Sequence, residues 1–161
     1  VDHRELTTDV PLPEIWKKIE GIGGVNGWYG SGWLWFLRGL LDRFVGGVGL
    51  RRGRRDPQLL RAGDSLDFWR VEEIERDKKL RLYAEMILPG KAWLEFKLEA
   101  KDGKTVVSQD ALFAPRGLGG QLYWYLVTPF HFFIFPTMLR NIVKSARKSE
   151  AAKKSTSHTL S

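Results

Sequence analysis

The stretch that decides the fold runs from Lys91 to Val107 and reads KAWLEFKLEAKDGKTVV. Apolar and polar side chains alternate along its first part, as they do on a strand with one buried and one solvated face. The apolar set comprises Ala92, Leu94, Phe96, Leu98 and Ala100. The pair Asp102-Gly103 then predicts a tight hairpin turn into a strand from Lys104 to Ala114. The stretch therefore predicts an antiparallel hairpin with one apolar face.

The same period of two continues upstream of this hairpin. Leu80, Leu82 and Ala84 alternate with polar or amphipathic residues, and Asp77-Lys78 and Pro89-Gly90 are plausible turns. We therefore expect a meander of four long antiparallel strands from Leu66 to Ala114.

Acidic residues gather near the first of these strands. They are Asp64, Asp67, Glu72 and Glu73. Strict alternation places Asp67 and Glu73 on one face with Trp69 and Val71, and Glu72 on the other with Leu66 and Phe68. Paired carboxylates act as acid and base only where the walls of a site shift their pKa values. A salt-bridged strand surface is the interpretation that we favour.

The segment from Leu122 to Leu139 is almost wholly apolar and rich in aromatic residues, and Arg140 to Lys148 continues it as a basic helix. It is the only segment long and apolar enough to cover the sheet. Pro129 and Pro136 interrupt it, which argues against a membrane span and predicts a bend near Pro129.

The remaining elements lie at the two ends of the chain. We expect a first strand from His3 to Val10, a helix from Glu14 to Glu20 and a second helix from Trp33 to Val45. A single domain should cover residues 1–147, followed by a polar, basic and disordered tail over residues 148–161. The first ten residues are polar and lack the apolar core of a signal peptide.

This order of elements predicts an α+β fold. A curved antiparallel sheet would wrap around a long kinked C-terminal helix, with two short helices after the first strand. The space between sheet and helix would hold an apolar cavity.

Three segments resemble a known family when they are taken together. They are GGVGLRRGRRDP at residues 46–57, GDSLDFWRVEE at residues 63–73 and YWYLVTPFHFFIF at residues 123–135. The chain is similar to the START-like (SRPBCC) helix-grip superfamily. More narrowly, it resembles an uncharacterised domain family often found C-terminal to NAD(P)-binding, epimerase-like Rossmann domains. The resemblance implies a hydrophobic pocket and no established reaction, because function in such folds varies with the pocket lining.

Composition narrows the classes of site. The chain has 161 residues, a formal net charge of +7 and no cysteine. Disulfides, cysteine nucleophiles and cysteine-ligated metals are therefore excluded, and a cytoplasmic location fits. The histidines at positions 3, 131 and 158 have no metal-ligand spacing, so we expect no metal. Three G-x-G starts lack the final glycine of a dinucleotide fingerprint, so we expect no bound cofactor.

A glycine-rich loop from Gly46 to Arg55 carries four arginines, which are Arg51, Arg52, Arg54 and Arg55. Arginine forks and glycine backbone N–H groups suit an anion, so the loop is a candidate anion-binding or docking site. The alternative is a mobile basic loop without a ligand.

Our leading hypothesis is a domain that binds an apolar or amphipathic small molecule, with a Rossmann domain as a possible partner. The candidate ligand-binding residues are Phe68, Tyr83, Leu94, Phe96, Tyr123, Phe130, His131 and Phe133. An enzyme of the cyclase or hydrolase kind is one alternative, and a structural domain with a filled core is another. Peripheral membrane contact stays open because basic residues follow the apolar run. Nucleic acid is disfavoured, since the aromatic residues do not lie beside the arginines.

Overall fold

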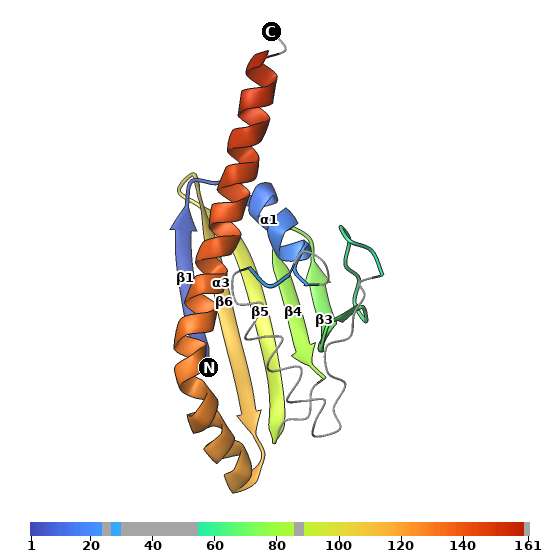
Figure 1. Cartoon of the computed structure of the whole chain (residues 1–161), viewed down its shortest axis with the longest axis vertical. Helices are drawn as coiled ribbons and strands as arrows, with labels where there is room; N and C mark the ends of the chain where they lie inside the picture. Colours follow the sequence, from blue (N-terminus) through green and yellow to red (C-terminus); the bar gives the residue numbers. More distant parts are fainter. Residues whose placement is uncertain (24–26, 30–54, 86–88, 160–161) are drawn as a thin grey trace.

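The computed structural model of the chain describes residues 1–23, 27–29, 55–85 and 89–159. Within these residues, six strands form one antiparallel sheet in the order β1-β6-β5-β4-β3-β2 (Figure 1). The elements are β1 (Asp2–Thr8), α1 (Leu12–Glu20), β2 (Ser65–Leu66), β3 (Trp69–Glu75), β4 (Lys79–Ala84), β5 (Gly90–Lys101), β6 (Lys104–Pro115) and α3 (Gly117–Thr159). The predicted α+β helix-grip fold is confirmed. The helix predicted from Trp33 to Val45 lies outside the described residues.

The central hairpin forms at the predicted turn. Asp102 and Gly103 have φ angles of 51° and 72°, and a two-residue turn with positive φ at both positions matches the twist of the strands on either side. Lys101 pairs with Lys104 across the turn, and the ladder runs from there to Gly90 and Pro115. β5 and β6 are thereby fixed in a single register over their whole length.

A bulge changes the alternation in β3. The register with β4 shifts between Val71 and Glu73, so Val71 pairs with Leu82 while Glu73 pairs with Arg81. Val71 is buried and both Glu72 and Glu73 are exposed. The prediction that Glu73 shares a face with Val71 was wrong, because the extra residue of a bulge moves the next side chain to the other face.

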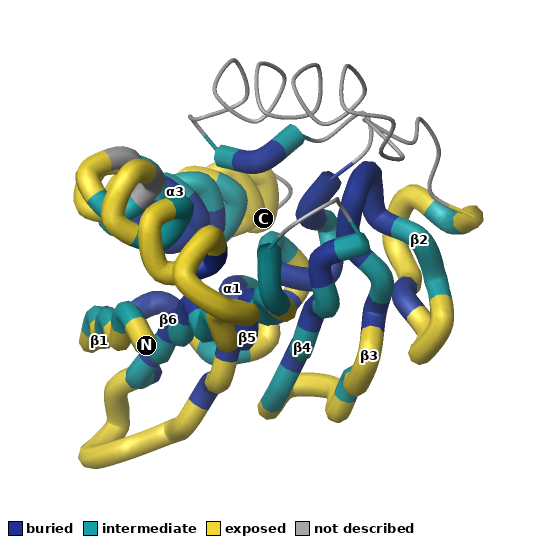
Figure 2. Tube along the Cα trace, turned by 90° about the horizontal axis from the view of Figure 1, so that it is seen from below, coloured by how far each residue is buried: buried dark blue, intermediate teal, exposed yellow. Residues whose placement is uncertain are grey.

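One face of the sheet, which we call the inner face, is covered by helices. Figure 2 shows α3 over β1 and β6, with α1 beside it over β5. The opposite, outer face is solvated. Large side chains buried between the layers stabilise the fold by about 1.5–3 kcal/mol each. They include Ile15, Ile19, Leu80, Leu82, Leu94, Phe96, Val107, Met138 and Ile142.

α3 continues without interruption through Pro129 and Pro136. Figure 1 shows that it changes direction in its lower half, so the helix is curved. The hydroxyls of Thr128 and Thr137 donate hydrogen bonds to the carbonyls of Trp124 and Phe133, at 2.6 and 2.7 Å. Such bonds often accompany helix bends. Within the described residues, no helix combines the length and apolar composition that a membrane span requires.

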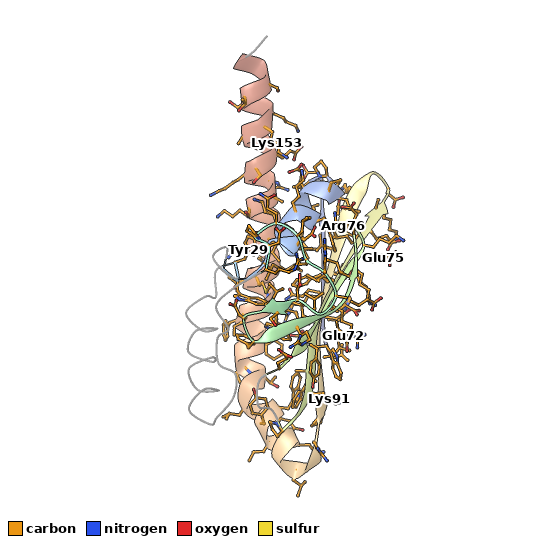
Figure 3. All side chains as sticks on the ribbon, turned by 90° about the vertical axis from the view of Figure 1, so that its right-hand side faces the viewer. Tyr29, Glu72, Glu75, Arg76, Lys91 and Lys153 are labelled. Atoms are coloured by element: carbon orange, nitrogen blue, oxygen red, sulfur yellow. The ribbon has the colours of Figure 1, made fainter. Side chains whose placement is uncertain are left out.

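The tail that we expected to be disordered from residue 148 is helical as far as Thr159. Alanines and lysines with high helix propensity occupy this end, and Lys154 forms an i,i+4 ion pair with Glu150 at 2.6 Å. Lys153 also reaches Glu14 of α1, at 2.7 Å. Figure 3 shows Lys153 on the part of α3 that extends beyond the sheet. These contacts and propensities extend the helix past the predicted domain end.

Candidate functional site

The candidate site is the layer between the inner face and α3. Leu94 and Phe96 of β5 are fully buried in this layer. The register sets Leu94 opposite Leu82 and Ala111, and sets Phe96 opposite Leu80 on β4. On its other side, Phe96 is opposite a polar residue of β6. Around Leu94 and Phe96 the layer is therefore apolar, except for the polar side chain opposite Phe96.

That polar residue is Gln109. Its side chain is only 1% exposed, and its Nε2 lies 3.8 Å from the thioether sulfur of Met138 on α3. A thioether is a weak acceptor. The Gln109 Oε1 atom is buried and accepts no hydrogen bond from any residue that the structure describes. Buried polar groups of this kind are uncommon in folded proteins and call for a water, an ion or a ligand as partner.

Arg4 lies directly opposite Gln109, on the edge strand β1. One of its terminal nitrogens donates to Asp2 at 3.2 Å, and its guanidinium lies 5.7 Å from the centre of the Phe132 ring on α3. Its Nε is buried and has no hydrogen-bond partner within the described part of the chain. Arg4, with a buried donor, and Gln109, with a buried acceptor, are thus neighbours across β1 and β6.

An aromatic group lies where β6 meets the start of α3. The ring of Phe113 stacks on Trp124, with centroids 5.4 Å apart, and lies 5.7 Å from the ring of Tyr123. Both α3 residues are half-buried. This group lies toward the lower end of α3, beyond the Gln109 position along β6.

Apart from Tyr83, the predicted ligand-binding residues fall into three sets. Phe68, Leu94 and Phe96 are fully buried, and Tyr123 is half-buried beside Phe113. Phe133 is 74% exposed and points away from the layer. The side chains of Phe130 and His131 lie outside the described residues. The structure brings together Leu94 and Phe96, which are neighbours on one face of β5.

Tyr83 lies on the outer face. It pairs with Trp93 across β4 and β5, and the two rings lie 5.8 Å apart. The guanidinium of Arg81 lies over the Trp93 ring at 5.6 Å. Tyr83 is therefore separated by the sheet from Leu94, Phe96 and α3.

Phe68 belongs to a second buried aromatic group, at the edge of the sheet near β2. It stacks on Trp28 at 6.0 Å and lies 5.7 Å from Trp69. Trp28 Nε1 donates to the buried carboxylate of Asp67 at 2.7 Å. Asp67 is thus held by a buried tryptophan and does not lie on an exposed strand surface, as the interpretation of the acidic residues would have it.

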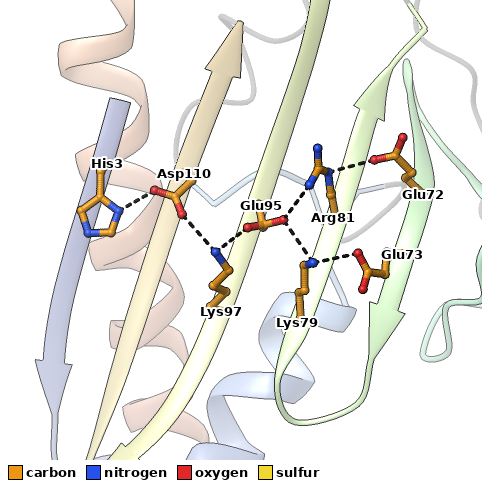
Figure 4. A network of polar contacts seen from close by, with 8 residues as sticks. All are labelled: His3, Glu72, Glu73, Lys79, Arg81, Glu95, Lys97 and Asp110. Atoms are coloured by element: carbon orange, nitrogen blue, oxygen red, sulfur yellow. Dashed lines mark hydrogen bonds and ion pairs between the residues drawn. The ribbon is translucent and has the colours of Figure 1, made fainter. Parts of the chain in front are cut away.

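The outer face carries a network of charges that crosses five strands (Figure 4). Its centre is Glu95, whose side chain is 7% exposed and which contacts Lys97 at 2.6 Å, Arg81 at 3.4 Å and Lys79 at 3.5 Å. Burial acts to raise the pKa of Glu95, but the hydrogen bond from Lys97 and the three positive charges together hold it below its ordinary value. The remaining members are His3, Glu72, Glu73 and Asp110.

Each acid in this network has a basic partner within the described residues, as expected of a salt-bridged strand surface. Glu72 contacts Arg81 at 2.9 Å and Glu73 contacts Lys79 at 2.7 Å. Neither shows the isolated, desolvated setting that acid–base catalysis needs. No group of three or more His, Asp or Glu side chains in the described ranges could hold a metal ion.

The predicted anion-binding loop is described only at Arg55, and Arg51, Arg52 and Arg54 lie outside the described residues. Arg55 forms a two-pronged contact with Asp64, through Nε and a terminal nitrogen at 3.2 Å each. The hydrogen bond from Arg55 is the main cause that holds the pKa of Asp64 below its ordinary value. Anion binding by the loop stays a prediction.

Sequence reasoning missed Gln109 and Arg4. The available signal was the alternation in β6, where the inward positions are Thr105, Val107, Gln109, Ala111 and Phe113. A glutamine in such a row is an anomaly that could have been noticed. The pairing of Gln109 with Arg4 could not have been found, since it depends on β1 pairing with β6, a strand about a hundred residues later in the chain.

A family model described as "Protein of unknown function (DUF2867)" matches residues 1–138, from β1 into α3. No curated protein matches the chain.

Several solved structures are similar to this chain. Protein NE0264 from Nitrosomonas europaea is 15% identical with a TM-score of 0.52, and the match covers 94% of this chain and 99% of that one. CalU16 from Micromonospora echinospora is 13% identical with a TM-score of 0.44, over 92% of this chain and 85% of that one. Ara h 8.0201 is 13% identical with a TM-score of 0.46, over 89% of this chain and 97% of that one. At such identities the likeness concerns the fold alone.

Proposed function

The chain belongs to the DUF2867 family, and from that premise we propose that it binds an amphipathic small molecule between the inner face and α3. The observation that carries this proposal is the buried Gln109 amide, set in an otherwise apolar layer. Ligand sites in proteins are mostly apolar, with a few polar groups that fix orientation. Gln109 and Arg4 have the character of such groups.

The two side chains define the polar end of the ligand. Gln109 Oε1 can accept a hydrogen bond and Arg4 Nε can donate one, and neither atom has a partner among the described residues. A hydroxyl or a carboxylic acid can form hydrogen bonds with both atoms, because it can donate one hydrogen bond and accept another. Leaving a buried acceptor without a partner costs about 1–3 kcal/mol. A ligand that supplies the hydrogen bond recovers that free energy.

The apolar body of the ligand would lie along β5 and β6 toward the start of α3. Leu94 and Phe96 supply its apolar contacts from the sheet, and Tyr123 does so beside Phe113. The resemblance stated above supports one further element, namely that the domain serves an NAD(P)-binding Rossmann partner by holding such a molecule for it.

The test uses cis-parinaric acid, a fluorescent fatty acid whose emission rises in apolar surroundings. The wild-type chain should bind it. Arg4→Met and Gln109→Leu should each weaken binding by about 2- to 10-fold, the equivalent of one net hydrogen bond. Arg61→Met is the matched control, since Arg61 is exposed and precedes β2, at the opposite edge of the sheet from β1.

Two results would contradict the proposal. In the first, the wild-type chain does not bind the probe. In the second, both variants bind it as tightly as Arg61→Met does, which would mean that neither Gln109 nor Arg4 takes part in binding.

A further inference from the structure

The outward side of α3 carries large, exposed apolar side chains that none of the other described elements covers. Six of them are 62–84% exposed, and they recur at spacings of three, four and seven along the lower half of the helix. They are Leu118, Leu122, Tyr125, Leu126, Phe132 and Phe133. Residues at these spacings share one side of a helix. We call this set the apolar stripe.

The same side of α3 becomes basic farther along. Arg140, Lys144 and Arg147 are exposed and continue the spacing from Phe133 by seven, four and three residues. Arg147 also contacts Asp9 at 2.7 Å. The sequence has no acidic residue between Asp110 and Glu150. One side of the helix thus presents an apolar stripe followed by a basic stripe of these three residues.

We propose that this side of α3 docks on an anionic lipid bilayer surface. The apolar stripe enters the boundary between headgroups and acyl chains, and the basic stripe contacts the headgroups. The two stripes together span about 44 Å at 1.5 Å per residue. The curvature of α3 in its lower half lets the two stripes lie at different depths (Figure 1).

Charge favours a lipid surface over a second copy of the chain. If two copies met through this side in parallel, basic stripes would face each other and repel. In an antiparallel pair, each basic stripe would lie against the apolar stripe of the other copy and lose water without gaining a counter-charge. An anionic bilayer offers an apolar interior and negative headgroups in one surface. The inference does not depend on the Gln109 site.

The test is co-sedimentation of the full chain with vesicles. One set is phosphatidylcholine alone, and the other is an equal mixture of phosphatidylcholine and phosphatidylglycerol. The chain should bind the mixed vesicles more tightly, and added salt should weaken that binding. Each basic residue near such a surface contributes about fivefold to affinity. Arg140→Gln/Lys144→Gln should therefore bind about 25-fold more weakly.

Matched controls show whether binding depends on where the basic and apolar residues lie or only on how many of them the chain has. Lys101→Gln/Lys104→Gln removes the same charge from the exposed tip of the central hairpin and should change binding far less. Leu122→Ser/Leu126→Ser should weaken binding by about tenfold or more per leucine, while Leu59→Ser, at an exposed leucine away from α3, should not. The four substituted positions on α3 and the three control positions are all exposed, so the melting temperature measured by circular dichroism should stay unchanged.

Three outcomes overturn the inference. They are failure of the wild-type chain to bind mixed vesicles, equal binding by the α3 variants and their controls, and a dimer in light scattering that the Leu122→Ser/Leu126→Ser variant dissociates. The last would assign this side of α3 to a protein interface.

Discussion

Replacing Gln109 with leucine should make the ligand-free protein more stable while it weakens ligand binding. The two side chains are similar in size, so the change leaves little cavity. It removes a buried acceptor with no partner among the described residues, a defect that costs about 1–3 kcal/mol. It also removes the weak contact to Met138 at 3.8 Å, worth less than about 1 kcal/mol. The net expectation is a gain of about 1 kcal/mol in the free energy of unfolding.

The assay is urea denaturation of protein that was first unfolded and refolded to remove any bound molecule. In a thermal melt of the same sample, a gain of about 1 kcal/mol should raise the melting temperature by about 2–4 °C. Gln58→Leu is the matched control, because Gln58 is exposed and its replacement should change stability by less than about 0.5 kcal/mol. A loss of stability of about 1 kcal/mol or more in Gln109→Leu would refute the reasoning. It would show that the amide is hydrogen-bonded in the folded protein and acts as part of the scaffold.

Further predictions concern the scaffold that presents this layer. Glu95→Gln should lower the free energy of unfolding, measured by urea denaturation, by about 1–2 kcal/mol, because three partly exposed cations lose their shared carboxylate. Glu99 is exposed on the same strand, and Glu99→Gln should change the free energy of unfolding little. Since the pKa of Glu95 is lowered in the folded state, its contribution to stability is present above the ordinary pKa of 4.5 and should be lost as the pH falls below that value. The free energies of unfolding of wild type and Glu95→Gln should therefore converge in acid. A difference that stays constant with pH would contradict this. Gly103→Ala should destabilise by about 1 kcal/mol, because its φ of 72° is unfavourable for a residue with a Cβ. Gly119 lies in α3, where an added Cβ meets open space, so Gly119→Ala should be neutral or stabilising. If Gly103→Ala and Gly119→Ala changed the melting temperature equally, the turn geometry at Gly103 would be wrong.

The sheet could be predicted because its signals are local. The alternation in β5 and the Asp102-Gly103 pair each depend on neighbouring residues, and the register followed from them. The bulge at Val71 could not be predicted, since nothing in the residues around Glu72 marks an extra position. The helical tail was missed for another reason. Its polarity was taken as a sign of disorder, although alanine, lysine and an i,i+4 pair with Glu150 favour helix.

The candidate site was predicted less well than the fold. Aromatic character pointed to Phe96 and Tyr123, which lie near the inner layer, but also to Phe133, which faces outward. Tyr83 was included for its ring, although alternation with Leu82 already placed it on the other face. The polar end of the site depends on β1 pairing with β6, so that Arg4 meets Gln109. A contact between residues so far apart in the chain has no local signature.

Native mass spectrometry of the freshly purified chain tests the central claim most directly. The account predicts a species heavier than the bare chain by the mass of one small amphipathic molecule, and a smaller fraction of that species in Gln109→Leu prepared in the same way. If wild type gives only the bare chain, even after incubation with cis-parinaric acid, or if Gln109→Leu retains the adduct undiminished, the claim that Gln109 holds a ligand beneath α3 is contradicted.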